Sequence, residues 1–96
     1  MTPEGKVKKS VQDVLKRYGA YFFTPATGGY GTSGLPDIVA CYKGRFLGIE
    51  CKAGKNRTST MQEHQLNSIT KAGGAALVVY ENNIQDVVRI LDGWNH

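Results

Sequence analysis

Two carboxylates and a lysine lie close together in the stretch GLPDIVACYKGRFLGIECKAGK, residues 34–55. Asp37 opens one short β-prone run, and Glu50 lies near the end of the next, with Lys52 two residues further on. Strand alternation points Lys52 to the same face as Glu50. Hard Mg²⁺ or Mn²⁺ prefers carboxylate oxygens, and a lysine beside such an ion can hold or deprotonate water or neutralise charge on a phosphate. The combination indicates metal-dependent hydrolysis of a phosphodiester.

The turn between the two runs decides whether the acids meet. The Lys-Gly pair at 43–44 favours a two-residue hairpin, which pairs Tyr42 with Arg45 and places Asp37 opposite Glu50. Cross-strand Cβ atoms lie roughly 4.5–5.5 Å apart, so two like charges there destabilise the sheet unless a cation offsets them. A three-residue connection would slip the register by one and send the acids to opposite faces.

A simpler interpretation needs no metal. Pro36 and Asp37 would be turn residues at a strand entrance, and Glu50 with Lys52 would be charges on an exposed edge strand. Charged edges are common, and Glu50 and Lys52 alone favour this interpretation. We favour the metal site because Asp37 and the proline before it join them across a hairpin.

The surrounding elements follow from hydrophobic periodicity and from capping residues. Thr2 is predicted to cap a first helix that Gly19 ends, and Thr60 with Glu63 resembles a capping box in a second helix. The run AALVVYE is typical of a strand buried on both faces. The further predicted elements are strands over 20–24, 37–42, 45–52 and 75–81, a glycine-rich loop over 25–36, and helices over 58–73 and 84–91. This order predicts an α/β fold whose mixed sheet is flanked by helices.

Composition agrees with one globular domain over residues 1–96. Hydrophobic residues make up 41% and charged residues 21% of the chain, and no apolar run suggests a membrane span. The N-terminus lacks the apolar stretch of a secretory signal, so a cytoplasmic location is expected. Cys41 and Cys51 are expected to be buried hydrophobes rather than metal ligands or a disulfide. The net charge of +4 weakly favours a polyanionic partner.

The motifs GLPD and ECK, together with Glu4 on the first helix, resemble those of the PD-(D/E)xK nuclease superfamily. The resemblance is closest to the VRR-NUC domains, the virus-type replication and repair nucleases, and it covers nearly the whole chain. It implies a restriction-endonuclease-like αβββαβ core, here followed by a C-terminal helix. The expected domain is therefore a single VRR-NUC-like nuclease domain.

The resemblance also implies the roles of individual residues. Asp37, Glu50 and the backbone carbonyl of Cys51 would coordinate Mg²⁺ or Mn²⁺, with no further small-molecule cofactor, and Lys52 would be the catalytic lysine. Glu4 would serve a second metal or act through water, although an acid is also favoured at a helix N-terminus without any such role.

Three further groups of residues are candidates for the site. Gln62 matches the glutamine that the family carries on a helix, where it would orient water, the lysine or the phosphate. Lys55 and Arg57 could bind the phosphate backbone, although solubility explains them about as well. Tyr30, in the glycine-rich loop, could stack on a base or cover the core.

The resemblance implies a function and a partner. Small standalone VRR-NUC proteins of viral and bacterial type resemble Holliday-junction resolvases, so we expect a structure-selective endonuclease that cuts four-way DNA junctions. The two-fold symmetry of a junction suits a homodimer, and Ile90, Leu91 and Trp94 would form its interface or pack on their own core. The alternatives are a nuclease acting on flaps, nicks, duplex DNA or RNA, and a non-catalytic nucleic-acid-binding module. A viral protein would act in the host cytoplasm.

Overall fold

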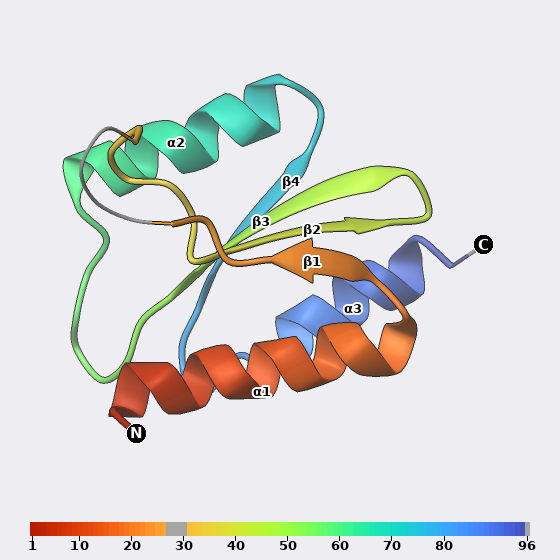
Figure 1. The fold of residues 1–96 in the computed structure, drawn as a ribbon, viewed down its shortest axis with the longest axis horizontal. Coiled ribbons are helices and arrows are strands. Elements are labelled where there is room, and N and C mark those ends of the chain that lie inside the picture. Colours follow the sequence, from red (N-terminus) through yellow and green to blue (C-terminus); the bar gives the residue numbers. More distant parts are fainter. Residues whose placement is uncertain (27–30, 96) are drawn as a thin grey trace.

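The computed structural model describes residues 1–26 and 31–95, which form three layers around one sheet (Figure 1). Helix α2 covers one face of the sheet, and α1 and α3 cover the other. The strands lie in the order β1-β2-β3-β4, so β2 and β3 are central. The elements are α1 (Pro3–Tyr18), β1 (Tyr21–Phe23), β2 (Ile38–Tyr42), β3 (Arg45–Cys51), α2 (Thr60–Lys71), β4 (Ala75–Val79) and α3 (Gln85–Gly93). The predicted order of elements and the α/β class are confirmed.

Helix α1 has the limits that its capping residues predict. The Thr2 hydroxyl accepts a hydrogen bond from the Gly5 N–H at 3.0 Å, and Gly19 ends the helix with a φ of +75°. Its apolar stripe packs in the core with strands β2 and β3. The buried members of the stripe are Val7, Val11, Val14 and Leu15.

The hairpin between β2 and β3 has the predicted two-residue turn. Lys43 and Gly44 both have positive φ, +54° and +78°, as a type I′ turn requires. Tyr42 pairs with Arg45, and the antiparallel ladder continues to the pair Ile38–Ile49. On its other side β3 pairs in parallel with β4, after the crossover through α2. This register is the one that brings Asp37 and Glu50 together.

Two details of the predicted elements are wrong. Helix α2 begins at Thr60, and its capping box joins Ser59 and Gln62 rather than Thr60 and Glu63, because Ser59 is the last residue with extended backbone. Strand β4 is not buried on both faces, since it lies at the edge of the sheet and only Val79 is fully buried.

The two cysteines have different environments. Cys51 is buried in the core as predicted, but Cys41 is exposed. Cys41 lies opposite Tyr21 and Phe46 on the face of the sheet that α2 covers only in part. Both cysteines are free thiols.

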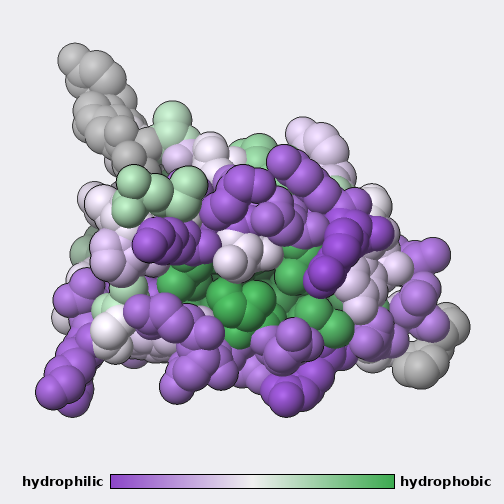
Figure 2. All heavy atoms as spheres, turned by 90° about the horizontal axis from the view of Figure 1, so that it is seen from below, coloured by the Kyte–Doolittle hydropathy of each residue, from purple (hydrophilic) through white to green (hydrophobic). Residues whose placement is uncertain are grey.

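The C-terminal helix packs on the core. Leu91 is fully buried, and Ile90 and Trp94 are partly buried against the core cluster. The Arg45 guanidinium lies over the Trp94 ring, 5.8 Å from its centroid. Seen from the α1 side, hydrophilic side chains surround a small apolar strip (Figure 2). Within the described ranges, no helix combines the length and apolar character that a membrane crossing requires.

Gly34, three residues before Asp37, joins the loop to the start of α2. Its φ is +76°, and a Cβ there would lie 2.5 Å from the main-chain carbon of Met61. Gly19 has nearly the same φ, +75°, but a Cβ there would meet nothing within 4 Å. A substitution at Gly19 therefore tests the backbone strain alone, and one at Gly34 tests the strain together with the steric contact.

We predict that Gly34→Ala destabilises the fold more than Gly19→Ala. Gly19→Ala should cost about 1 kcal/mol for the left-handed backbone alone, whereas Gly34→Ala should cost roughly 2–4 kcal/mol because the backbone of α2 must also move. Urea denaturation of both variants measures the difference. Equal losses would show that the contact between the loop and α2 is not tight.

Candidate active site

Asp37 and Glu50 meet at one end of the central strands. Asp37 comes directly before β2 and Glu50 is the penultimate residue of β3, so continuing the register beyond the pair Ile38–Ile49 places them opposite one another. The Asp37 carboxylate also accepts a hydrogen bond from the Cys51 N–H at 2.8 Å. This bond ties the entrance of β2 to the end of β3 and fixes the position of Asp37.

Glu50 is a buried carboxylate with an unused acceptor. Its side chain is 1% exposed, and its Oε2 atom has no hydrogen-bond partner. Since β3 is hydrogen-bonded to strands on both sides, the edge-strand explanation of Glu50 is wrong. A buried carboxyl oxygen without a partner is costly, so such a group points to a role beyond folding.

The surroundings of Glu50 raise the pKa of its carboxyl group. Burial, followed by a hydrogen bond to Asp37 and the negative charge of Asp37, raises the pKa of Glu50 to about 8. The Lys52 ammonium opposes this rise in the pKa, and the Glu4 carboxylate adds to it. Lys52 and Glu4 therefore both act electrostatically on Glu50.

The donor set fits a divalent cation of the Mg²⁺ type. Asp37 and the unpartnered Glu50 oxygen supply hard carboxylate ligands, and such an ion keeps several waters when only one or two protein carboxylates bind it. Among the residues that the structure describes, no group of three or more His, Cys, Asp or Glu side chains is placed to hold a metal. A third protein ligand would therefore be a group other than these side chains, such as a main-chain oxygen.

The Cys51 thiol plays no part in this donor set. Burial and the charges of Asp37 and Glu50 raise the pKa of the thiol to about 12. Its side chain belongs to the hydrophobic core. A thiol that stays protonated is neither a nucleophile nor a metal ligand at neutral pH.

Gln62 caps its own helix. Its Oε1 accepts a hydrogen bond from the Ser59 N–H at 2.8 Å, and its own N–H donates to the Ser59 hydroxyl at 3.1 Å. The first turn of α2 lies against Gly34, in the loop that leads to Asp37. The structure therefore shows Gln62 as a helix cap beside this loop, with no hydrogen bond to the acids.

The segment after Lys52 is held in place by the two residues that follow β4. The Glu81 carboxylate accepts two hydrogen bonds from the Gly54 N–H, both at 3.1 Å, and the Tyr80 hydroxyl donates to the Asn56 carbonyl at 2.7 Å. Lys55 and Arg57, the predicted DNA contacts, are exposed on this braced segment. Tyr30 lies outside the described residues.

A pocket of about 540 Å³ joins α1 to this segment. Glu4 lines it together with Lys55, which places the N-terminus of α1 beside the chain that follows Lys52. The other lining residues are Thr2, Pro3, Ala53, Gly54, Asn56 and Glu81.

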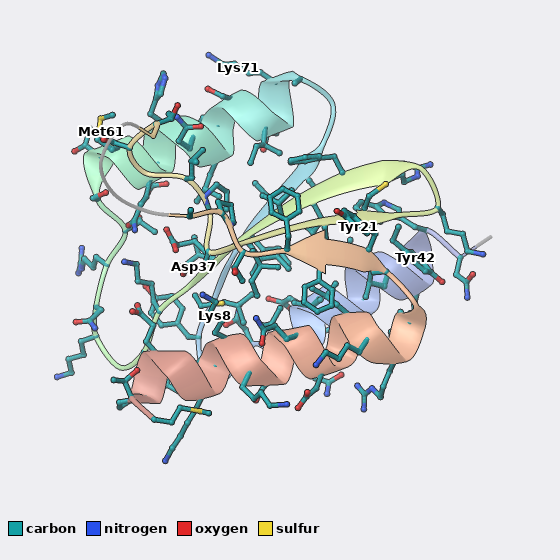
Figure 3. The ribbon with its side chains drawn as sticks, viewed as in Figure 1. Lys8, Tyr21, Asp37, Tyr42, Met61 and Lys71 are labelled. Atoms are coloured by element: carbon teal, nitrogen blue, oxygen red, sulfur yellow. The ribbon has the colours of Figure 1, made fainter. Side chains whose placement is uncertain are left out.

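Lys8 also belongs to this region, although the sequence did not identify it as a candidate. Lys8 is half-buried and extends from α1 toward Asp37 (Figure 3). Its charge acts on the Cys51 thiol, whose pKa it lowers. The signal in the sequence was the spacing of four between Glu4 and Lys8, which puts both on one side of a helix.

The raised pKa of Glu50 predicts a pH-dependent stability. Because this pKa is higher in the folded chain, about 8, than the ordinary value of 4.5, the contribution of Glu50 is fully present below pH 4.5 and is lost as the pH rises to 8. Glu50→Gln keeps the shape and removes the titration. In EDTA the wild type should lose on the order of 2 kcal/mol of stability as the pH rises, which lowers its melting temperature. Glu50→Gln should show a much smaller fall in melting temperature.

Thermal melts of both proteins at pH 5, 6.5 and 8 measure this difference. Glu63→Gln, at an exposed position on α2, is the matched control and should leave the profile unchanged. Parallel melting profiles for the wild type and Glu50→Gln would contradict the raised pKa.

Comparison with known proteins places the chain in a family. Among solved structures, a VRR_NUC domain matches with a TM-score of 0.75 at 20% identity, over 96% of this chain and 97% of that domain. The Holliday junction resolvase Hjc of Archaeoglobus fulgidus matches with a TM-score of 0.61 at 25% identity. That match covers 79% of this chain and 66% of the resolvase. No curated protein sequence matches the chain.

These matches confirm the restriction-endonuclease-like fold and the VRR-NUC resemblance. The family model described as archaeal Holliday junction resolvase (Hjc) matches residues 5–90, a range that contains Asp37, Glu50 and Lys52 and begins directly after Glu4. Since this range spans most of the sequence, the chain belongs to the archaeal Holliday junction resolvase family.

Proposed function

We propose that this protein is a Mg²⁺- or Mn²⁺-dependent endonuclease that cleaves four-way DNA junctions as a homodimer. Its family makes it a structure-selective, junction-resolving nuclease. The observation that carries the metal dependence is the buried Glu50 carboxylate, whose Oε2 has no partner and which lies opposite Asp37 in the centre of the sheet. A divalent cation would supply the missing partner and offset the repulsion between the two acids.

In this proposal Asp37, Glu50 and the Cys51 carbonyl hold the cation. A bound divalent cation in such a site stabilises negative charge on the phosphoryl group and assists deprotonation of the attacking water. The Asp37 carboxylate is already oriented by its bond to the Cys51 N–H, so little rearrangement is needed. Glu4, whose charge acts on Glu50 from α1, would serve a second metal or act through water.

Lys52 would act on the reacting phosphate or on the water. Lys52 is the first residue after β3 and is half-buried, and its charge acts on Glu50. From there its ammonium group would neutralise charge that develops on the phosphate or orient the attacking water. Lys55 and Arg57 would bind neighbouring phosphates from the braced segment. Gln62 would keep the loop before Asp37 in place.

The first prediction of this function concerns the site itself. Asp37→Ala and Lys52→Ala should each reduce cleavage of a labelled four-way junction at least about 100-fold in Mg²⁺ or Mn²⁺, because each removes a group that acts on the transition state. EDTA should abolish cleavage by the wild type. Linear duplex, flap, nicked and single-stranded DNA are the substrate controls.

The control variant is Lys71→Ala, an exposed lysine at the far end of α2, which should cleave normally. Circular dichroism verifies that every variant is folded. Normal cleavage by folded Asp37→Ala or Lys52→Ala would refute the assignment of the site. Preferential cleavage of flaps or duplex DNA would keep the nuclease and change its substrate.

An uncovered part of the sheet supports the homodimer. Helix α2 lies over β3 and β4, and the neighbouring face of β1 and β2 carries Tyr21 and Phe23, which are 70% and 48% exposed. Cys41 and Phe46 lie in the same cross-strand row as Tyr21, where Cys41 is exposed and Phe46 of β3 is 45% exposed. We refer to Tyr21, Phe23, Cys41 and Phe46 as the aromatic face.

A second copy of the chain suits this aromatic face better than DNA does. The face carries no charged side chain, whereas DNA binding depends on cationic contacts to phosphates. A two-fold axis through such a face would bury the same aromatic residues from both copies. The resulting pair of active sites would match the two symmetric strands of a junction.

Tyr21→Glu should therefore convert a dimer to a monomer, because it places charge at the centre of an apolar contact. Analytical ultracentrifugation measures the mass of the particle in solution. Met61→Glu is the matched control, since Met61 is also an exposed apolar residue, 49% exposed, but lies on α2 away from the aromatic face. A wild type that is monomeric at all concentrations, or a Tyr21→Glu dimer as stable as the wild type, would contradict this interface.

A further inference from the structure

Lys8 occupies a different environment from the other basic residues of α1. At about 100° per residue, Lys8 follows Glu4 by one turn and borders the buried stripe of Val7, Val11 and Leu15 on the same side. Lys8 is half-buried. The exposed basic residues of the helix are Lys6, Lys9, Lys16 and Arg17. Helix geometry therefore directs Lys8, and not its neighbours, to the side of α1 that carries Glu4.

That side of α1 faces the active site. In Figure 3 the side chain of Lys8 extends from the helix toward the sheet beside Asp37. The buried Cys51 thiol, at the end of β3, is within the electrostatic reach of Asp37, Glu50, Lys8 and Glu4 together. Lys8 thus brings a positive charge to the end of β3, where the charges of Asp37, Glu50 and Glu4 also act.

The Lys8 ammonium is not used by the folded chain itself. Over residues 1–26 and 31–95, the close ion pairs are Lys9–Asp13 and Arg89–Asp86, and neither involves Lys8. Lys9, the next residue, lies 2.6 Å from Asp13 on the outer surface of the helix. A half-buried lysine without a partner, at the border of a site that must accept a phosphodiester, is available to the substrate.

We propose that Lys8 contacts a phosphate oxygen of the DNA strand at the cleavage site, as a second lysine that acts together with Lys52. The inference rests on the proposed function, since it requires that this site bind DNA. The physical need is one of charge: a bound divalent cation would offset Asp37 and Glu50, and the phosphodiester that joins them brings a further negative charge near Glu4, which Lys52 and Lys8 together can neutralise. From α1, Lys8 can approach the phosphate from the side of the helix, while Lys52 approaches it from the sheet.

A purely structural role for Lys8 makes a different prediction. In that case Lys8 would only offset the charge of the acids in the free protein, and its loss would lower stability without changing the number of phosphate contacts. Contact with a phosphate is measured by the salt dependence of binding, because each phosphate neutralised contributes about 0.9 to the slope of log K against log salt for duplex DNA. The salt slope separates the two roles.

The test compares Lys8→Gln, Lys8→Arg and the control Lys6→Gln, each combined with Glu50→Gln to prevent cleavage. Lys6 is exposed on the opposite flank of the same helix. Binding of a labelled four-way junction in EDTA is followed by fluorescence anisotropy between 50 and 300 mM salt. Lys8→Gln should weaken binding about tenfold at the lower salt and reduce the slope by about 0.9. Lys8→Arg and Lys6→Gln should keep the slope.

A second arm uses chains with Glu50 intact and measures single-turnover cleavage in Mg²⁺. Lys8→Gln should slow cleavage more than tenfold, and Lys8→Arg should recover most of the rate. Equal salt slopes for Lys8→Gln and Lys6→Gln would overturn the proposal, and a loss of melting temperature with an unchanged slope would assign Lys8 to folding. If the wild type cleaves no DNA in either metal, the proposed function fails, and the slope still decides whether Lys8 contacts phosphate.

Discussion

A carboxylate buried in the middle of a β-sheet is the constraint around which this molecule is arranged. Glu50 has a strand on each side, a second acid opposite it and one oxygen without a partner. The arrangement costs folding energy in the absence of a cation. It persists because the rest of the sheet over-determines it: the type I′ turn sets the register, and the bond from the Cys51 N–H to Asp37 closes the open end of the hairpin.

The groups of the candidate site come from several rigid elements. The acids belong to the central hairpin, Glu4 and Lys8 come from one flank of α1, and the basic segment after Lys52 is held by Tyr80 and Glu81 at the end of β4. The loop before Asp37 rests on the first turn of α2. The relative positions of these carboxylates and lysines therefore depend on packing between elements that are far apart in the sequence.

Local patterns in the sequence predicted the elements that depend on local interactions. The caps of α1, the turn at 43–44 and the pairing of Tyr42 with Arg45 all follow from neighbouring residues, and each is confirmed. Sheet order is not local: AALVVYE has the composition of a central strand but lies at an edge, since among the strands that the structure describes it pairs with β3 alone. The capping box of α2 was misplaced by one residue because Ser59 and Thr60 are both good N-caps.

The residues of the site divide in the same way. The acids and Lys52 could be predicted because strand alternation and a short turn relate them. The brace from Glu81 depends on where β4 docks, which no nearby residue specifies. The capping hydrogen bond of Gln62 is local, and it was missed because two adjacent residues could each cap α2. The exposure of Cys41 has the same origin, since it depends on how much of one sheet face α2 covers.

The stacking of Arg45 on Trp94 gives the protein a built-in optical reporter. Trp94 is the sole tryptophan of the chain, and it contacts Arg45, the first residue of β3. Glu50 lies five residues after Arg45 on this strand, roughly 17 Å from Arg45 at the usual rise per residue. Indole emission should thus follow the loss of the C-terminal helix from the core without direct quenching by an ion or a nucleotide at the acids. Unfolding and ligand binding can therefore be observed separately in the unlabelled protein.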